Sequence, residues 1–136
     1  MPKTEAEMVD AAIAVLRRQS VEHATEVPIL HRSIDLVFRD GHDFVAVEFK
    51  RRDWRRGLLQ AQDHALAADR VYLCLPPTRI TNRLKREATT AGVGILSWTP
   101  DNPLRTVAVA PRSNLVWSVT KGWLAERLSF CRQNDL

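Results

Sequence analysis

Three residues in the first half of the chain have the types and spacing of a hydrolytic site: Asp35, Glu48 and Lys50. Two neighbouring carboxylates suit a hard cation such as Mg²⁺, which prefers oxygen ligands and retains water molecules. Such a site can activate water and bind a phosphate. A lysine beside it would orient the water or offset charge that develops on the phosphate. Together the three side chains predict cleavage of a phosphodiester bond.

A β-hairpin is the element expected to bring these side chains together. Residues 32–39 and 43–50 each alternate between apolar and polar types, which predicts two strands. The stretch 40–42 between them, Asp-Gly-His, has the composition of a tight turn.

The register of this hairpin decides whether the three side chains meet. A two-residue loop at 41–42 places Asp35 opposite Glu48, and Lys50, two positions further on, points to the same face. Moving the loop by one residue keeps this parity, whereas a bulged three-residue loop would undo it. Like charges opposed across two strands are destabilising, so a cation is expected between them. The backbone carbonyl of Phe49 is a further candidate ligand.

The same residues have a plainer interpretation, a solvated and salt-bridged face of an exposed hairpin. Against it, Val37, Phe44 and Ala46 on that face are apolar, and the following helix needs a surface on which to pack. Acids on a partly covered face need partners. Both interpretations stay open at this stage, and the apolar neighbours favour a site.

Periodicity and capping predict the surrounding elements. Apolar residues at helical spacing predict a helix over 4–19, with Thr4 as N-cap and Glu7 as its capping-box partner. A polar stretch that contains Pro28 precedes the hairpin. The later elements are a helix at 54–68, a strand at 70–75, a basic helix at 79–90 ended by Gly92, and strands at 93–98 and 104–109. The tail from Ser113 is expected to be helical, with Gly122 interrupting the helix, although Leu115 to Val119 could equally extend a sheet. Strand, helix and strand in succession predict parallel pairing through a right-handed crossover.

Length and composition bound the class of protein. The 136 residues, 45% hydrophobic and 26% charged, predict one soluble globular domain. A net charge of +4 suits a polyanionic partner without identifying one. No apolar run has the length of a membrane span and the N-terminus lacks a signal-peptide core, so a cytoplasmic protein with no membrane contact is expected. Cys74 and Cys131 have no metal-ligand spacing and are expected as reduced thiols, Cys74 in the core.

The string Ile34-Asp35, followed thirteen positions after the aspartate by Glu48-Phe49-Lys50, resembles the PD-(D/E)xK nuclease superfamily. The predicted order of elements is similar to the shared core of that superfamily, which is helix, three strands, helix, strand. Ile34 stands where a proline is usual, at a position that varies within the superfamily.

This resemblance implies an α/β fold with a restriction-endonuclease-like core: a helix, a mixed sheet that contains the hairpin, a βαβ unit and a C-terminal helix. The core would cover about 4–98, with a strand and helix extension over 99–136, in a single domain of 1–136. Asp35 and Glu48 would bind Mg²⁺ or Mn²⁺, and Lys50 would be the catalytic lysine.

Two further positions come from the same resemblance. Some branches carry a Gln on the helix after the lysine, followed four residues on by Tyr; here Gln60 matches and His64 departs from the pattern, although His64 could face the groove. Gln60 would position reacting groups. Some members also place an acid on the first helix, and Glu5, on the same stripe as Val9, is the candidate metal ligand, although a first-turn acid also favours the helix dipole.

Two basic segments are candidates for binding nucleic acid. Their residues are Arg51, Arg52, Arg55, Arg56, Arg79, Arg83 and Arg86. The first four lie at the start of a predicted helix, where cations oppose the macrodipole and phosphates would pair with them. The last three are expected to share a helical face, for which solvation is the default interpretation. Trp54 is expected to pack on the core rather than to stack on a base.

The resulting hypothesis is a metal-dependent endonuclease that acts on DNA in preference to RNA. A homodimer would let two sites cut both strands of a duplex. A rival hypothesis is a catalytically inactive nucleic-acid-binding module. A third is a subunit of a larger defence or repair complex, with Trp98, Trp117 and Trp123 at an interface, although tryptophans are more often in the core. The sequence contains neither a P-loop nor a dinucleotide-binding fingerprint.

Overall fold

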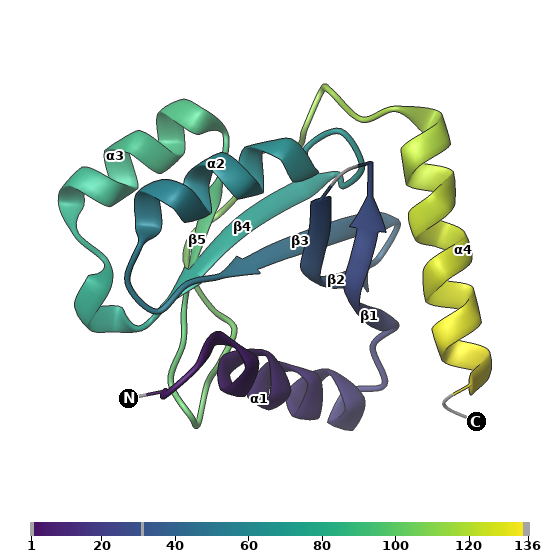
Figure 1. The fold of residues 1–136 in the computed structure, drawn as a ribbon, viewed down its shortest axis with the longest axis horizontal. Helices are drawn as coiled ribbons and strands as arrows, with labels where there is room; N and C mark the ends of the chain where they lie inside the picture. The colour runs from purple at the N-terminus through teal and green to yellow at the C-terminus, as the bar shows by residue number, and fades with distance from the viewer. Residues whose placement is uncertain (1, 31, 135–136) are drawn as a thin grey trace.

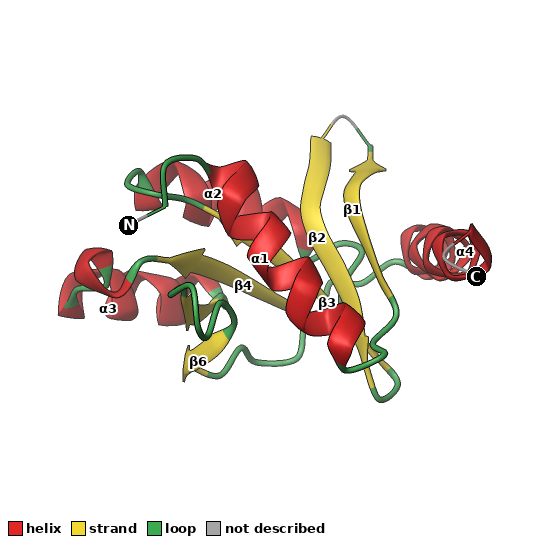
Figure 2. Ribbon diagram, turned by 90° about the horizontal axis from the view of Figure 1, so that it is seen from below, coloured by secondary structure: helices red, strands yellow, loops and turns green. Residues whose placement is uncertain are grey.

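A six-stranded mixed sheet forms the centre of the molecule, with helices on both of its faces (Figures 1 and 2). The computed structural model describes residues 2–30 and 32–134, with side chains as far as Ser129. The elements in chain order are α1 (Glu5–Arg18), β1 (His23–Ile29), β2 (Arg32–Asp40), β3 (Asp43–Phe49), α2 (Trp54–His64), β4 (Arg70–Leu75), the 3₁₀ turn η1 (Pro77–Arg79), α3 (Asn82–Ala91), β5 (Gly94–Ser97), β6 (Arg105–Ala108) and α4 (Ser118–Asn134). The strands lie in sequence order; β3, β4 and β5 are parallel, and the other neighbouring pairs are antiparallel. The expected mixed α/β class and the parallel crossovers are confirmed.

The hairpin of β2 and β3 has the predicted register. Asp40 pairs with Asp43 across a two-residue loop, and the ladder continues to the pair of Leu36 and Val47. Gly41 at the first loop position has a φ of 62°, which glycine adopts without a steric penalty. The strand bounds differ from the prediction by one residue at one end of each strand.

Strand β1 was missed, because the polar stretch with Pro28 gives no clear strand signal. Pro28 is tolerated here because β1 is an edge strand of the sheet. Glu26 has a φ of 48° and lies between the residues that pair with Ile34 and Leu36. This left-handed residue interrupts the alternation of β1, and Ile34 and Leu36 belong to different hydrophobic clusters.

Helix α2 ends at His64, so the predicted end at residue 68 is wrong. The N–H groups of Ala67 and Ala68 both donate to the carbonyl of His64, which turns the chain away from the helix axis. Asp69 then fixes the approach to β4, since its side chain accepts a hydrogen bond of 2.8 Å from the N–H of Phe44. Residues with good helix propensity leave the helix because tertiary contacts override that propensity.

The basic helix begins later than predicted. Thr81 is the N-cap of α3, because its hydroxyl accepts from the N–H of Leu84 at 3.2 Å. Arg79 lies before it, in η1, so the expectation that Arg79 shares a helical face with Arg83 and Arg86 is wrong. Gly92, with a φ of 74°, ends α3 as predicted.

The C-terminal part follows the prediction except in detail. Strands β5 and β6 lie within the predicted ranges. Residues 113–117 are neither helix nor strand, and α4 runs through Gly122 instead of being interrupted there. Helix α4 packs beside β1, at the opposite end of the sheet from α3 (Figures 1 and 2).

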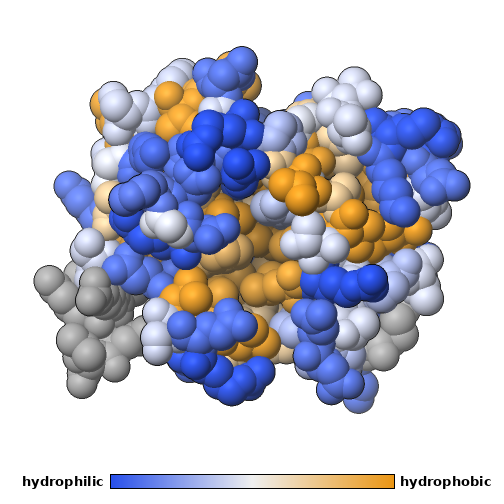
Figure 3. Space-filling model, turned by 180° about the vertical axis from the view of Figure 1, so that it is seen from behind, coloured by the Kyte–Doolittle hydropathy of each residue, from blue (hydrophilic) through white to orange (hydrophobic). Residues whose placement is uncertain are grey.

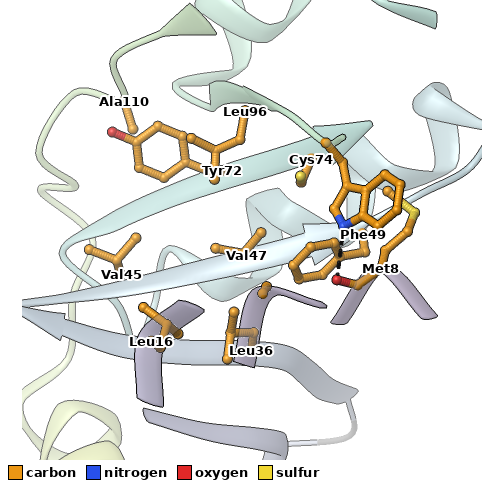
Figure 4. Packing of buried hydrophobic residues seen from close by; sticks show 12 residues of the cluster. Met8, Leu16, Leu36, Val45, Val47, Phe49, Tyr72, Cys74, Leu96 and Ala110 are labelled. Carbon is orange, nitrogen blue, oxygen red and sulfur yellow. Dashed lines mark hydrogen bonds between the residues drawn. The ribbon is translucent and has the colours of Figure 1, made fainter. Parts of the chain in front are cut away.

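Helix α1 covers one face of the sheet. Its Met8 packs with Leu36, Val47 and Phe49 in the cluster drawn in Figure 4. Trp98 belongs to this cluster, and its Nε1 donates to the carbonyl of Met8 at 3.0 Å, the dashed line in Figure 4. These contacts fix the first turns of α1 over the C-terminal end of β3.

Of the two hydrogen bonds in the predicted capping box of α1, the structure has one. Thr4 Oγ1 accepts from the N–H of Glu7 at 3.0 Å. The carboxylate of Glu7 accepts from the N–H of Lys3 rather than from that of Thr4, as a capping box would require. The helix therefore has its N-cap, with the reciprocal bond moved by one residue.

The opposite face has two further clusters. Helices α2 and α3 pack on Leu73, Leu75 and Ile95. Helix α4 packs with β1 over Phe44 and Ala46. The apolar face predicted around the two acids is thus covered by helices.

Surface features bear on the remaining expectations. Cys74 is buried as predicted and forms no disulfide with a described residue, whereas the Cys131 side chain, also predicted as a thiol, lies outside the described side chains. Trp98 is in the core, which removes it from a predicted interface, while Trp117 and Trp123 are 54% and 46% exposed. Figure 3 shows that hydrophobic atoms also reach the middle of the rear surface, between hydrophilic groups.

None of the helices in the part of the chain that the structure describes has the length and apolar character needed to cross a bilayer.

Candidate functional site

A pocket of about 390 Å³ lies where β3 ends and β2 begins. Its lining residues are Glu5, Arg32, Ser33, Asp35, Glu48, Phe49, Lys50, Gln60 and His64. Every residue predicted to be catalytic or to bind metal is among them, contributed by α1, the β2–β3 hairpin, the residue that follows it, and α2. The parallel strands β3, β4 and β5 end at this side of the sheet, the edge at which open α/β sheets bind ligands.

Glu48 is the most buried acid of the pocket, with a relative exposure of 4%. Its Oε2 lies 3.1 Å from Nε2 of His64, and its Oε1 lies 3.8 Å from Nζ of Lys50. A carboxylate enclosed in this way is not part of a solvated hairpin face, so the plainer interpretation of the sequence is wrong for Glu48. Its two oxygens are instead held in fixed directions by α2 and by the end of β3.

Asp35 lies just beyond the last ladder pair of β2 and β3. Its Oδ2 accepts from the N–H of Phe49 at 2.9 Å, so a side chain takes the place of a backbone acceptor. Burial, and after it the charge of Glu48, raise the pKa of Asp35 to about 6 against the opposing effects of the Phe49 N–H and the Lys50 and His64 charges. The two acids are therefore close enough to repel each other, as the hairpin register predicted.

Helix α2 passes very close to the side chain of Lys50. A Cβ at position 57 would lie 2.8 Å from Cγ of Lys50 and 2.6 Å from a methyl group of Leu73, so only glycine fits. The N–H of Lys50 donates to the carbonyl of Cys74 at 3.0 Å, which ties this residue to β4. Gly57 and this hydrogen bond together direct the ammonium into the pocket.

Gln60 presents a polar atom to the pocket without a partner. Its Oε1 is buried and accepts no hydrogen bond from any described residue. Buried polar atoms are almost always satisfied, and an orphan of this kind in a pocket indicates a group that the protein alone does not supply. Glu5, on the first turn of α1, lines the same pocket and is half-buried.

Arg32 and Ser33 line the pocket but were absent from the predicted residues, and His64, which was expected to be able to face the groove, had no predicted role. The position of His64 one helical turn after Gln60 was a usable signal, because residues four apart share a helix face. Arg32 forms a salt bridge with Asp63 of α2 at the pocket rim. Its role depends on that contact across the fold, for which the sequence has no signal.

The predicted nucleic-acid-binding arginines lie outside the pocket. Arg51 is partly buried, and its Nε donates to the carbonyl of Pro2 at 3.1 Å. The exposed ones are Arg52, Arg55, Arg56, Arg79, Arg83 and Arg86. The guanidinium of Arg55 lies 4.4 Å from the ring centroid of Trp54, and Trp54 is half-buried against the core as expected. Arg83 pairs with Glu87.

The oxygen donors of the pocket fit a hard cation better than a soft one. Among the described side chains, no group of three or more His, Cys, Asp and Glu residues could hold a metal ion. The oxygens at hand are those of Asp35 and Glu48, the carbonyl of Phe49 and the unsatisfied Oε1 of Gln60. Mg²⁺ is usually bound by one or two carboxylates, with water and substrate phosphates completing its shell.

Comparisons with known proteins bear on the fold alone. No protein-family model and no curated protein matches the chain. The solved structure of SPO1766, a protein of unknown function from Silicibacter pomeroyi, is similar over 99% of this chain and 90% of that one, with a TM-score of 0.69 and 14% sequence identity. A second solved structure, of the protein of unknown function AF1548, covers 67% of this chain and 58% of that one, with a TM-score of 0.48 and 15% identity. The first likeness extends to nearly the whole fold.

Proposed function

We propose that the protein is a metal-dependent endonuclease of the PD-(D/E)xK type that hydrolyses phosphodiester bonds of DNA. The observation that carries the proposal is the pocket in which Asp35, Glu48 and Lys50 meet beside the unpaired Oε1 of Gln60. The order α1, β1, β2, β3, α2, β4 supports it, because helix, three strands, helix, strand is the core that the resemblance implies.

In this proposal Asp35 and Glu48 bind Mg²⁺ or Mn²⁺, with the Phe49 carbonyl and Glu5 as further ligands. The bound cation would supply an activated water and polarise the scissile phosphate. The burial of Asp35 and its repulsion from Glu48 favour this assignment, since a bound cation would offset both of these effects, which raise the pKa of Asp35.

The remaining side chains orient the reacting groups. Lys50, whose Nζ lies 3.8 Å from Glu48 Oε1, would hold the attacking water and offset negative charge on the phosphate. Gln60 would use its free oxygen to position water or substrate. His64 holds Glu48 from the other side. The exposed arginines at the start of α2 would bind phosphates next to the pocket.

The test is cleavage of plasmid, linear, single-stranded and branched DNA with Mg²⁺ or Mn²⁺, by the wild type and by the Glu48→Ala and Lys50→Ala variants. We expect metal-dependent cutting that falls at least about 100-fold in both variants, because each removes a group that acts in the transition state. Asp101→Ala and Arg18→Ala, which change exposed residues outside the pocket and outside the two basic segments, are the matched controls and should cut normally. Undiminished cutting by both site variants would reject this site.

The second candidate function is a nucleic-acid-binding module without catalysis, alone or within a defence or repair assembly. The exposed Arg52, Arg55 and Arg56 favour it, because they lie outside the pocket and do not require it to be active. Salt-sensitive DNA binding by the wild type with no cutting under any metal would support this candidate over the enzyme.

A further inference from the structure

The rim of the pocket carries a cation that the proposed hydrolysis does not use. Arg32, at the start of β2, lines the pocket together with Asp35 and Lys50. Its Nε forms a salt bridge with Asp63 Oδ2. The side chains of this pair are 40% and 49% exposed, so both groups face solvent at the pocket mouth.

The pair joins the two elements that carry the site. Arg32 lies three residues before Asp35 on β2, and Asp63 directly precedes His64 on α2. Figure 1 shows the C-terminal end of α2 next to the start of β2, in agreement with this contact. The salt bridge therefore spans the rim between the strand and the helix on one side of the pocket.

The charges inside the pocket make this cation important for an anionic substrate. Three lining residues are acids, Glu5, Asp35 and Glu48, and Lys50 is already next to Glu48. Before a metal is bound, a phosphate that enters meets repulsion from these acids, and Arg32 adds a second positive charge that can receive it. Arginine is well suited to this, since its planar guanidinium binds phosphate oxygens through two parallel hydrogen bonds. An exposed salt bridge contributes little to stability, so Asp63 can be exchanged for a phosphate at small cost.

We propose that Arg32 binds a backbone phosphate of the nucleic acid next to the pocket, and that Asp63 competes with this phosphate for the guanidinium. The pair then acts as an electrostatic gate: Arg32 is held by Asp63 in the free protein and transfers to the phosphate when nucleic acid arrives. This inference rests on the proposed function for the identity of the ligand, a phosphodiester.

Affinity for a short fluorescent DNA duplex, measured with Ca²⁺ in place of Mg²⁺ to prevent turnover, tests the gate in the whole protein. We expect Arg32→Gln to weaken binding about tenfold and to reduce the salt dependence by about one counterion. Asp63→Asn should tighten binding about three- to tenfold, because it releases Arg32. In the Arg32→Gln background, Asp63→Asn should have no effect, since the two residues act through each other.

The control is Asp101→Asn, which removes one exposed negative charge elsewhere. If it tightens binding as much as Asp63→Asn does, the effect is one of net charge and the gate is overturned. Arg32→Gln with wild-type affinity, or Asp63→Asn with weaker affinity, overturns it too. Inorganic phosphate is added as a competitor to separate the two sources of the ligand. If it inhibits duplex binding by the wild type at concentrations that do not affect Arg32→Gln, the site binds phosphate in general. This result would overturn the preference for nucleic acid.

Failure of the gate and failure of the proposed function give different results. A wild type that binds the duplex with the expected variant pattern but never cuts with Mg²⁺ retains the gate and loses the enzyme. A wild type that cuts, with all Arg32 and Asp63 variants equal to it in affinity, retains the enzyme and loses the gate. A wild type that does not bind the duplex overturns both.

Discussion

A pair of acids lies at each end of β3, and the two pairs have different charged neighbours. At the N-terminal end, Asp43 contacts Arg112 at 2.7 Å and Arg70 at 3.4 Å, and Asp69 contacts Lys121 at 2.9 Å. At the C-terminal end, Asp35 and Glu48 share Lys50 at 3.8 Å from Glu48 and the ring of His64. One pair is surrounded by cations at short distance, and the other has fewer of them at longer distance.

The pKa values of Asp43 and Asp35, one at each end, move in opposite directions. Burial would raise the pKa of Asp43, but hydrogen bonds and charges from Arg112 and Arg70 lower it below its ordinary value. Burial and, to a smaller extent, the neighbouring charge of Glu48 together raise the pKa of Asp35 to about 6. The acids at the N-terminal end are thus paired with cations, whereas a cation between Asp35 and Glu48 stays a prediction of the proposed function.

The largest effect on stability is expected at the N-terminal end of β3, where the acids are paired with cations. Asp69→Ala should lower the free energy of unfolding by about 3 kcal/mol, because it leaves the Phe44 N–H and the Lys121 ammonium without a buried partner. Urea denaturation measures the change. DNA cleavage by the folded variant should be unchanged. A loss below about 1 kcal/mol would mean that this network behaves like surface ion pairs and that the two ends do not differ as argued.

The next effect concerns the close approach of α2 to the site. Gly57→Ala should cost about 2 kcal/mol, because the new methyl group would overlap Leu73 and the stem of Lys50. Cleavage should fall as well, since the ammonium moves. Gly122→Ala is the matched control: nothing lies within 4 Å of its Cβ position, and the variant should be as stable as the wild type or more stable. Equal effects of the two changes on cleavage would contradict the role given to Gly57.

A pH dependence of opposite sign is expected at the two ends. The folded protein holds the proton of Asp35 more tightly than the unfolded chain does, so stability is lost as the pH rises from about 4 through 6. Asp35→Asn should therefore be more stable than the wild type at pH 8, by about 1–2 kcal/mol after allowance for partial exposure, and about equal to it at pH 4.

The control for Asp35→Asn is Asp43→Asn. The pKa of Asp43 is lower in the folded state than in the unfolded chain, so the ionised carboxylate stabilises the fold at pH values above its ordinary pKa, and this stabilisation is lost as the pH falls. Asp43→Asn should therefore be less stable than the wild type at pH 8. Free energies of unfolding at both pH values measure the two signs. If Asp35→Asn is less stable than the wild type at pH 8, the inference that the folded protein disfavours the ionised form of Asp35 is wrong.

The smallest effect is expected for the residue that holds Glu48. His64→Ala should reduce metal-dependent cleavage about tenfold, because Glu48 Oε2 loses the group that orients it. His64→Gln keeps an N–H donor on the same helix face and should restore much of the activity. The metal concentration that gives half-maximal cleavage should rise in His64→Ala and recover in His64→Gln. If both variants require the same metal concentration as the wild type, His64 has only a packing role.

Patterns within the chain predicted much of the candidate site. The alternation of β2 and β3 and the Asp-Gly-His turn predicted a hairpin that, without a bulge, keeps Asp35 and Glu48 on one face, and the structure has the two-residue loop of that prediction. The cap at Thr4 and the end of α3 at Gly92 were also readable, because each depends on residues within a few positions. Local geometry determines these features, so local sequence carries their signal.

Contacts between distant segments decided the rest. Strand β1 exists because the edge of β2 accepts it despite Pro28, and α2 stops at His64 because Asp69 directs the chain into β4. The sequence by itself determined which residues could do chemistry and which face they share. Only the tertiary structure decided which acids are balanced, because the positive charges that neutralise Asp43 come from Arg70 and Arg112, which lie 27 and 69 positions away along the chain.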